Sequence, residues 1–243
     1  MRRLKSVAAL CMALALAGPA AASTLGISLS WVNAQGGTST WTHSQSGTPS
    51  GSGPEETFVG QRVTGGWTLG WDVTADADPF VNGFFSIQNS SATTQTYSFT
   101  VTLPVSPPVT PISTLGGSIG VTVTDANGNG VATVSSAGAG YVFNAANDGT
   151  TTLQLLGPGF ALNAPYAGGS ATASANAGLP GATIASIAAN GTISITHTFT
   201  LTPGDSVGLT SFYQVVAVPE PSRLALAAAS ALFLFALGRR RTA

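Results

Sequence analysis

Apolar and polar residues alternate along most of this 243-residue chain, with the period of two that is typical of β-strands. The clearest segment is 192–201, in which Ile193, Ile195 and Phe199 alternate with serine and threonine. Strands with one apolar face and one Ser/Thr face are typical of antiparallel sheets that bury one side. The same alternation predicts further strands at 27–31, 97–103, 119–123 and 153–155.

Residues 63–73 also alternate, and we interpret them as one strand whose apolar face carries Val63, Trp67 and Trp71. Gly65 and Gly66 interrupt this segment, and they predict a bulge or kink within the strand. No internal segment has a convincing helical period, and no internal repeat is visible.

Four segments lack the alternation. Residues 42–56 are rich in Gly, Ser and Pro without an apolar side chain, which predicts a long flexible surface loop. Residues 166–191 are rich in Ala and Gly, and they fit either strands of small residues or an extended loop. Residues 104–111 contain four prolines and predict a rigid crossover between sheets, and residues 202–205 predict the turn that joins the last two strands.

About eight to eleven strands at short spacing predict an all-β fold. We expect an antiparallel β-sandwich of the jelly-roll or immunoglobulin-like type, which occupies residues 23–217. Two terminal segments of different character flank this domain.

The first 22 residues have the organisation of a secretory signal peptide. Three positive charges precede a short apolar run, and Ala20 and Ala22 provide the small side chains that signal peptidase requires. We predict cleavage between Ala22 and Ser23, and an uncleaved anchor is the alternative, although the apolar run is short for a membrane span. Cleavage would remove the only cysteine, Cys11, so the mature chain would contain neither a disulfide nor a thiolate metal ligand.

Residues 218–243 form the second terminal segment. A rigid spacer comes first, because Pro219 and Pro221 restrict the backbone and disfavour a helix before Pro221. The apolar residues that follow predict a short hydrophobic transmembrane helix at 224–238. The chain then closes on a basic cluster of Arg239, Arg240 and Arg241.

Pro219, Glu220 and Pro221, the apolar segment and the arginine cluster, in this order, resemble the PEP-CTERM sorting signal of Gram-negative bacteria. The resemblance covers about a tenth of the chain. It implies handling by an exosortase, a membrane-embedded cysteine transpeptidase thought to cut near the Pro-Glu-Pro. Delivery to the cell surface or to an exopolysaccharide matrix would follow, and the mature protein would end near Pro219 to Pro221. The signal does not say what the delivered domain does.

Charge divides the chain in the same way. Seven of the eight basic residues lie in the terminal segments, whereas the region between Ser23 and Val218 holds eight carboxylates and only Arg62, a formal charge of 1 − 8 = −7. Nucleic-acid binding is excluded, because it needs a basic surface. Positive charge at both termini predicts that the ends face the cytoplasm while the β domain is exported across the inner membrane and transiently anchored there.

The stretch from Asp125 to Gly130 matches the first half of a calcium loop, with Asp125, Asn127 and Asn129 as oxygen ligands at alternate positions. However, Ser136 occupies the twelfth position, where a bidentate glutamate is expected, and strand-like residues flank the loop. Asn-Gly between strands is also the strongest hairpin signal. We favour the hairpin, keep calcium as the alternative, and predict no other cofactor.

The remaining titratable residues have simpler interpretations. Asp72, Asp76 and Asp78 could bind calcium or act as acid and base, but aspartates at strand ends more often form turns. His197 lies on an apolar strand face and is expected to be a hydrogen-bonded core or rim histidine, while His43 carries no signal in the expected loop. The chain has no nucleophile elbow, zinc-protease motif, phosphate loop or well-placed pair of carboxylates, so we predict no enzymatic activity.

Four tryptophans complete the candidate chemistry. Trp31, Trp67 and Trp71 share their faces with aliphatic residues and are predicted to lie in the core. Trp41 lies in a Ser/Thr-rich strand beside the expected loop, and it is the best candidate for an exposed ring that stacks on sugar. Burial of Trp41 remains an open alternative at this point.

These observations predict an exported, surface-sorted, non-enzymatic protein with a structural or adhesive role in the cell envelope or exopolysaccharide matrix. The first alternative is a carbohydrate-binding module that uses Trp41, with or without calcium. The second alternative is a hydrolase. The expected partners are signal peptidase, an exosortase, the membrane and extracellular polysaccharide.

Overall fold

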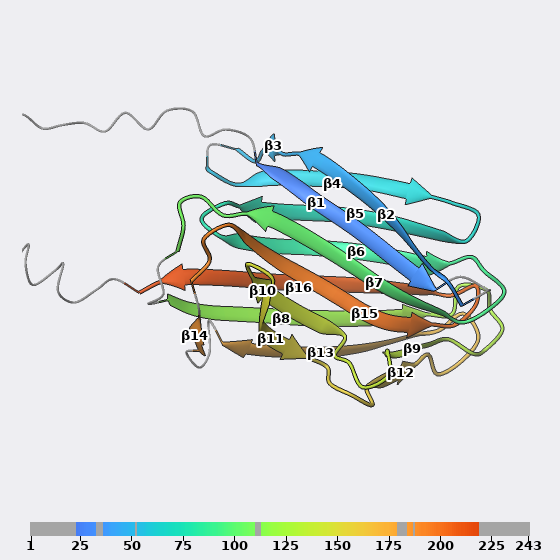
Figure 1. The fold of residues 1–243 in the computed structure, drawn as a ribbon. Coiled ribbons are helices and arrows are strands. Elements are labelled where there is room, and N and C mark those ends of the chain that lie inside the picture. Colours follow the sequence, from blue (N-terminus) through green and yellow to red (C-terminus); the bar gives the residue numbers. More distant parts are fainter. Residues whose placement is uncertain are drawn as a thin grey trace, which may run out of the picture.

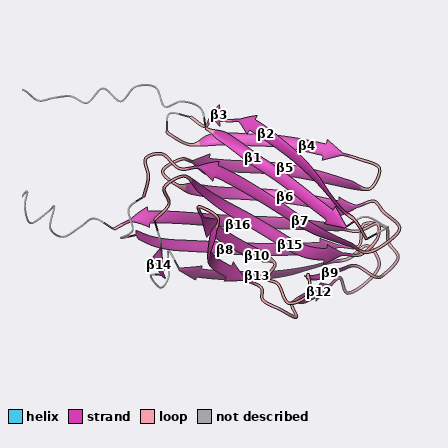
Figure 2. Cartoon of the chain, in the orientation of Figure 1, coloured by secondary structure: helices cyan, strands magenta, loops and turns pink. Residues whose placement is uncertain are grey.

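The structure, a computed structural model, describes residues 23–32, 36–51, 53–109, 113–178, 184–186 and 188–218. All regular structure in these residues is β-strand, and sixteen strands form two antiparallel sheets (Figure 2). The prediction of an all-β antiparallel fold is confirmed. The strands outnumber the expectation, because four of them are only two to four residues long and show no readable alternation.

The first sheet has the order β11–β10–β15–β7–β1–β2, with β9 beside β15 and β12 beside β9. Its central pair, β15 and β7, sets His197 opposite Phe99 and Ile195 opposite Val101. The strands are β1 (Thr24–Val32), β2 (Thr38–Ser46), β7 (Gln95–Pro104), β9 (Thr133–Ser136), β10 (Phe143–Asn147), β11 (Thr150–Leu155), β12 (Ala161–Asn163) and β15 (Thr192–Leu201).

The second sheet has the order β13–β8–β16–β6–β5–β4–β3, with β14 also beside β8. Its longest pair, β8 and β16, is in register from Ser206 opposite Thr124 to Ala217 opposite Ser113. The strands are β3 (Thr48–Pro49), β4 (Glu56–Val63), β5 (Trp67–Asp76), β6 (Phe80–Asn89), β8 (Ser113–Thr124), β13 (Ser170–Gly178), β14 (Ile184–Ser186) and β16 (Ser206–Ala217).

The two sheets lie face to face, and the strands of one cross those of the other obliquely (Figure 1). One row of apolar side chains from each strand fills the space between them, as in a β-sandwich. Phe85 of β6 and Phe99 of β7 meet across this interface with ring centroids 4.8 Å apart, and both are fully buried. The period of two in the sequence therefore arises because each strand has only one face in the core.

Two expectations about connections are wrong. Gly65 and Gly66 do not bulge within a strand but form the turn between β4 and β5, where Thr64 Oγ1 accepts the N–H groups of Gly66 and Trp67. The segment 42–56 is not one loop, because β2 continues through Ser46, and β3 and the first residue of β4 lie within it. Every residue of β2 is in register with β1, so backbone pairing continues the strand through residues 42–46, which have no apolar side chain.

Other expected connections are confirmed. Residues 104–111 follow β7 in the first sheet and precede β8 in the second, so this segment is a crossover, described as far as Val109. Residues 202–205 join β15 to β16 and also change sheets. Within 166–191, strand β13 has alternating Ser/Thr/Asn and alanine residues, and Ala171 and Ala175 pack against the core.

Several predictions fall outside the described residues. These are the signal peptide (residues 1–22), the sorting residues from Pro219 to Arg241 and the hydrophobic helix at 224–238. The described part of the chain has no helix that is long and apolar enough to span a membrane.

The outer face of the first sheet carries hydroxyl groups instead of charges. Thr100 and Thr196 are hydrogen-bonded at 2.9 Å across β7 and β15, and Ser30 and Thr40 at 2.9 Å across β1 and β2. No strand of this sheet contains Asp, Glu, Lys or Arg within the described residues. Such cross-strand pairs stabilise the sheet and leave an uncharged face.

Candidate functional site

The open side of the sandwich lies between β2 and β4. Strand β2 ends the first sheet, and only the two-residue strand β3 pairs with the outer edge of β4. In Figure 1 the C-terminal end of β2 lies near β4 at the upper side of the molecule, and the rest of β2 runs obliquely away from it. Gln45 of β2 bridges them, because its Nε2 donates to the backbone carbonyl of Val59 on β4 at 3.1 Å.

The inner row of β2 differs in chemistry from that of its neighbour β1. Register places Gln45, His43 and Trp41 opposite Leu25, Ile27 and Leu29, which are buried core residues. Residues directly opposite in an antiparallel pair point to the same face, so the three β2 side chains also point toward the second sheet. At the edge strand, the aliphatic core is therefore replaced by an aromatic and polar row.

Five aromatic rings meet at this edge. The indole of Trp41 stacks on the imidazole of His43, with centroids 5.7 Å apart and planes 13° apart. Trp41 also packs against Trp71 at 6.1 Å and Trp67 at 6.0 Å, and Trp67 meets Trp31 edge-on at 5.2 Å. Such tilted and edge-on pairs are favourable geometries for aromatic rings.

Trp71 forms the floor of the site and is fixed in orientation. Its indole N–H donates to Gln45 Oε1 at 2.8 Å, so the ring is held from the opposite sheet. Gly60 of β4 lies directly over the ring, and a Cβ there would fall only 2.6 Å from Trp71 Cε2. A glycine is therefore required for this approach of backbone to indole.

Together these residues surround a hollow of about 370 Å³, which we call the edge groove. Its size falls within the range of small-molecule sites, which combine apolar surface with a few polar groups. The half-buried indole of Trp41 lies there beside the exposed polar side chains of His43, Gln61 and Arg62. A flat aromatic ring beside hydrogen-bonding groups is the combination that a sugar ring can use. The lining residues are Trp41, His43, Gln45, Val59, Gly60, Gln61, Arg62 and Trp71.

The tryptophan predictions are largely confirmed. Trp67 and Trp71 are buried, and Trp31 is partly buried against the core. Trp41, for which the sequence left burial open, is half-buried and faces the edge groove. The placement of His43 in a loop was wrong, because it lies on β2 in the same row as Trp41.

A second, smaller hollow lies at the end of the sandwich, beside Trp31 and Trp67. It has a volume of about 250 Å³ and adjoins the turn that precedes β7. The hydroxyl of Tyr97 and Oε1 of Gln95 are buried there, and neither has a hydrogen-bond partner among the residues that the structure describes. Burial also raises the pKa of Tyr97, which keeps the phenol neutral. The rest of the wall is mostly apolar, so these two polar atoms are exceptions within it.

The hairpin predicted at residues 125–130 is wrong, because β8 lies in the second sheet and β9 in the first. This loop crosses between sheets, and Asp125 organises it. Asp125 accepts the N–H groups of Gly128 at 2.8 Å and Asn129 at 3.2 Å through Oδ1, and those of Gly130 at 2.7 Å and Gly168 at 3.1 Å through Oδ2. Burial alone would raise the pKa of Asp125, but these four bonds outweigh it and hold the pKa below its ordinary value.

The other two proposed calcium ligands are engaged in the same way. Asn127 Oδ1 accepts the N–H of Asn129, and Asn129 Oδ1 accepts the N–H of Val131. The described residues also contain no group of three His, Cys, Asp or Glu side chains placed to hold a metal ion. Because the candidate oxygens already accept backbone N–H groups, the geometry favours an ordered loop, and calcium stays an untested prediction.

Asp205 is fully buried beside this loop. Its Oδ2 accepts the hydroxyl of Thr202 at 2.6 Å. Burial raises the pKa of Asp205, and the neighbouring negative charge of Asp125 raises it further. This acid is therefore easier to protonate than an exposed aspartate.

The turn interpretation is supported for Asp76 and Asp78, but it is wrong for Asp72, which lies within strand β5. Asp76 Oδ1 accepts the N–H of Asp78 at 3.0 Å in the connection between β5 and β6. Asp72 is exposed on the outer side of β5, the side that faces away from the core. The geometry gathers no acid–base pair from these three residues.

His197 is a core histidine, as expected. It is fully buried between Phe85, Phe99 and Phe143, and its Nε2 lies 2.7 Å from Ser211 Oγ on the other sheet. Burial lowers its pKa to about 3, so the ring is neutral in the folded protein. A serine and a histidine at this distance could form a nucleophile and base, but both are buried away from any substrate.

Sequence reasoning missed five residues that line the edge groove, which are Gln45, Val59, Gly60, Gln61 and Arg62. A signal for Gln45 existed, since it follows Trp41 and His43 at the same period of two. No local signal could identify Gly60 and Arg62, because their role depends on how the second sheet lies against β2.

Known proteins give no guide to this groove. No family model matches the chain, and no curated protein matches it. Function must therefore be inferred from the residues of this chain.

Proposed function

We propose that this chain is an exported, surface-sorted, non-enzymatic protein whose β domain holds extracellular polysaccharide in the edge groove. Its role would be structural or adhesive, in the cell envelope or in an exopolysaccharide matrix. Of the two expected sandwich types we propose the jelly-roll type, because successive strands from β6 to β9 alternate between the sheets.

The observation that carries the binding function is the half-buried ring of Trp41 at the edge of the core. A half-buried indole that lines a hollow, beside polar side chains, is suited to a sugar ring. The floor is rigid, because the Trp71 indole is fixed by Gln45. A preorganised groove loses little conformational entropy when a ligand binds.

The contact between Ser23 and Glu56 supports the proposed signal cleavage. The backbone nitrogen of Ser23 donates to Glu56 Oε2 at 2.8 Å, and Glu56 is only 9% exposed. Cleavage after Ala22 would convert this nitrogen into an α-ammonium group. The new terminus would then lie against a carboxylate on the other sheet, and a charge-assisted hydrogen bond would replace a neutral one.

Mass spectrometry of the extracellular protein tests the export and sorting proposal. We expect the mature chain to begin at Ser23 and to end near Pro219 to Pro221, because signal peptidase and an exosortase would remove the flanking segments. An extracellular form that still contains Arg241 would overturn the sorting proposal. One that still contains Met1 would overturn the cleavage proposal.

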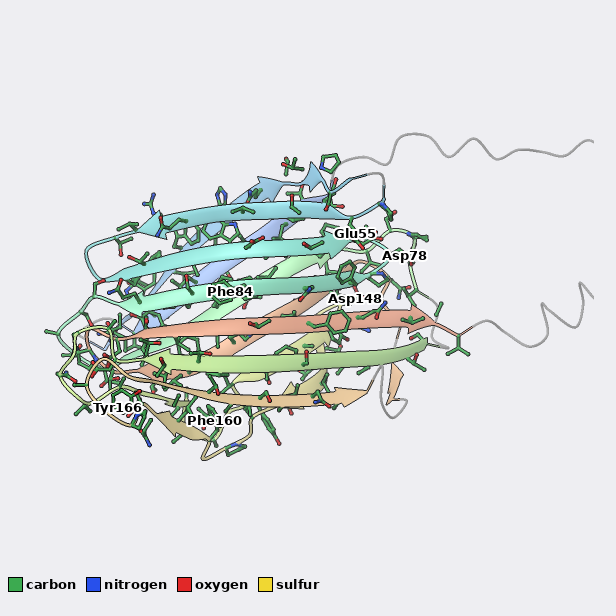
Figure 3. All side chains as sticks on the ribbon, turned by 180° about the vertical axis from the view of Figure 1, so that it is seen from behind. Glu55, Asp78, Phe84, Asp148, Phe160 and Tyr166 are labelled. Atoms are coloured by element: carbon green, nitrogen blue, oxygen red, sulfur yellow. The ribbon has the colours of Figure 1, made fainter. Side chains whose placement is uncertain are left out.

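Glycan binding is tested with Trp41→Ala and the matched control Phe84→Ala. Phe84 is also an exposed aromatic residue, at 51%, but it stands on the outer face of β6, a strand that contributes no residue to the groove lining (Figure 3). We expect Trp41→Ala to weaken binding of extracellular oligosaccharides by roughly tenfold or more, because the stacking surface is lost. Phe84→Ala should bind like the parent protein.

Tryptophan fluorescence titration measures both variants, and circular dichroism and melting temperature confirm that each is folded. Trp41→Phe serves as a milder variant that keeps a ring in the cluster, and it should lose less affinity than the alanine variant. If the parent protein binds no glycan, or if Trp41→Ala and Phe84→Ala bind equally well, the groove is not a glycan site.

A further inference from the structure

The edge groove contains the only cationic lysine or arginine side chain of the exported domain. Arg62 is the single Lys or Arg between Ser23 and Val218, a region that holds eight carboxylates. It lines the same hollow as Trp41 and His43. In a domain with a formal charge of −7, one positive group within a candidate binding site needs a physical explanation.

Strand register explains how Arg62 reaches the groove. Along β4, Phe58 is buried, Gly60 is half-buried and Arg62 is exposed, and the three alternate positions share one face. This row faces the first sheet, since Phe58 lies in the core and Arg62 pairs with the buried Leu69. The inward-facing row of β4 therefore begins in the core at Phe58 and reaches the groove at Arg62, whose guanidinium lies at the end of the row.

Arg62 is not used by the fold. Its backbone belongs to the ladder between β4 and β5, but its guanidinium makes no hydrogen bond or ion pair with any of the described residues. A guanidinium presents five N–H donors in a planar fork, which matches a carboxylate in bidentate geometry. These donors remain available to a ligand in the groove.

Carboxylates are kept out of the groove wall. None of its lining residues is acidic. Asp72, which lies on the strand next to β4, is exposed on the outer side of the sheet. Glu56, which shares the inner row of β4, is engaged by the Ser23 nitrogen at the opposite end of the strand. The groove lining therefore carries the positive charge of Arg62 and no negative charge, although the domain is acidic.

We propose that the edge groove selects acidic sugars, with the carboxylate of a uronic acid residue bound by Arg62 while its ring stacks on Trp41. The proposal rests on the proposed glycan function and specifies its ligand. Charge-assisted bonds to a carboxylate are about twice as strong as neutral ones, so an acidic sugar gains most from this side chain. A neutral sugar would use only the stacking surface and the neutral polar groups.

The test compares pairs of oligosaccharides that differ only in the carboxylate. The probes are galacturonate, glucuronate and mannuronate oligomers, each beside its carboxyl-reduced form, titrated into the full-length protein by tryptophan fluorescence. We expect at least one acidic oligomer to bind about tenfold tighter than its reduced partner. Arg62→Gln should remove that preference and leave the weaker neutral binding, and Arg62→Lys should restore only part of it, because an ammonium lacks the planar fork.

Asn82→Asp is the matched control, since it changes the net charge by the same amount as Arg62→Gln on the exposed outer side of β6. It should leave the preference intact. A preference that survives in Arg62→Gln, or is lost equally in Asn82→Asp, overturns the role of Arg62. Equal binding of every acidic oligomer and its reduced partner overturns the acidic selectivity but leaves glycan binding by Trp41 standing. If no oligomer of either kind binds, both proposals fail.

Discussion

Lowering the pH from 7 to 4.5 is expected to reduce the free energy of unfolding by about 2 to 3 kcal/mol through His197 alone. Burial lowers the pKa of this imidazole to about 3, whereas the ring titrates near its ordinary value of 6.5 in the unfolded chain. Between these values the unfolded state binds the extra proton, so stability rises with pH. The contribution of His197 is fully present above about pH 6.5 and is lost as the pH falls toward 3.

Urea denaturation at pH 7 and pH 4.5 measures this loss in the parent protein and in the double variant His197→Leu/Ser211→Ala. Both partners are replaced because a single change would leave the other polar group buried and unpaired. The double variant should show a pH dependence smaller by the stated amount. Ser211→Ala alone retains the titrating ring and serves as the control.

Asp205 has the opposite effect on the pH dependence of stability. Its pKa is raised in the folded protein, so the stability that its protonation contributes is lost as the pH rises through the titration range of this acid. This contribution is present in all the variants and cancels in the comparison. Equal pH dependence in the parent and the double variant would show that the folded protein admits a charged His197.

Replacing Gly60 with alanine is expected to destabilise the protein by about 1 to 3 kcal/mol and to weaken glycan binding. The new Cβ would lie 2.6 Å from Trp71 Cε2 and 3.0 Å from Cη2, which is closer than van der Waals contact allows. The ring cannot move freely, because its N–H is bonded to Gln45 and Trp41 and His43 pack against it. Relief of the clash must therefore disturb the floor of the groove.

Gly65→Ala is the matched control, because a Cβ at that turn position would meet no atom within 4 Å. Thermal unfolding and fluorescence titration of both variants measure stability and affinity. The control should retain the parent melting temperature and affinity. If Gly60→Ala behaves like Gly65→Ala, the close approach of Gly60 to Trp71 has no energetic consequence.

Strand character was predictable from the sequence because it depends on which residues alternate. The alternation of Ile193, Ile195 and Phe199 with polar residues predicts a strand with one buried side. All three residues are fully buried in the structure. His197 occupies the same face, so its place in the core followed from the same pattern. These are local properties, set by a side-chain period that needs no knowledge of the neighbouring strands.

Strand partners were not predictable in the same way. The Asn-Gly signal at Asn127 indicated a turn correctly, but the chain changes sheets there and does not return on its own neighbour. Residues 42–46 lack any apolar signal and still form a strand, because β1 supplies the hydrogen-bonding partners. Strand pairing depends on residues far apart in the sequence, so the composition of one segment does not show which strand it pairs with.

The sequence by itself determined the all-β class, the buried rows, the acidic character of the domain and the expectation of export from its two terminal segments. It also singled out Trp41. Only the tertiary structure decided that Trp41, His43 and Arg62 share one groove, since β2 and β4 belong to different sheets. The physical reason is that alternation tells which side chains face the other sheet, whereas the packing of two sheets decides which of them meet.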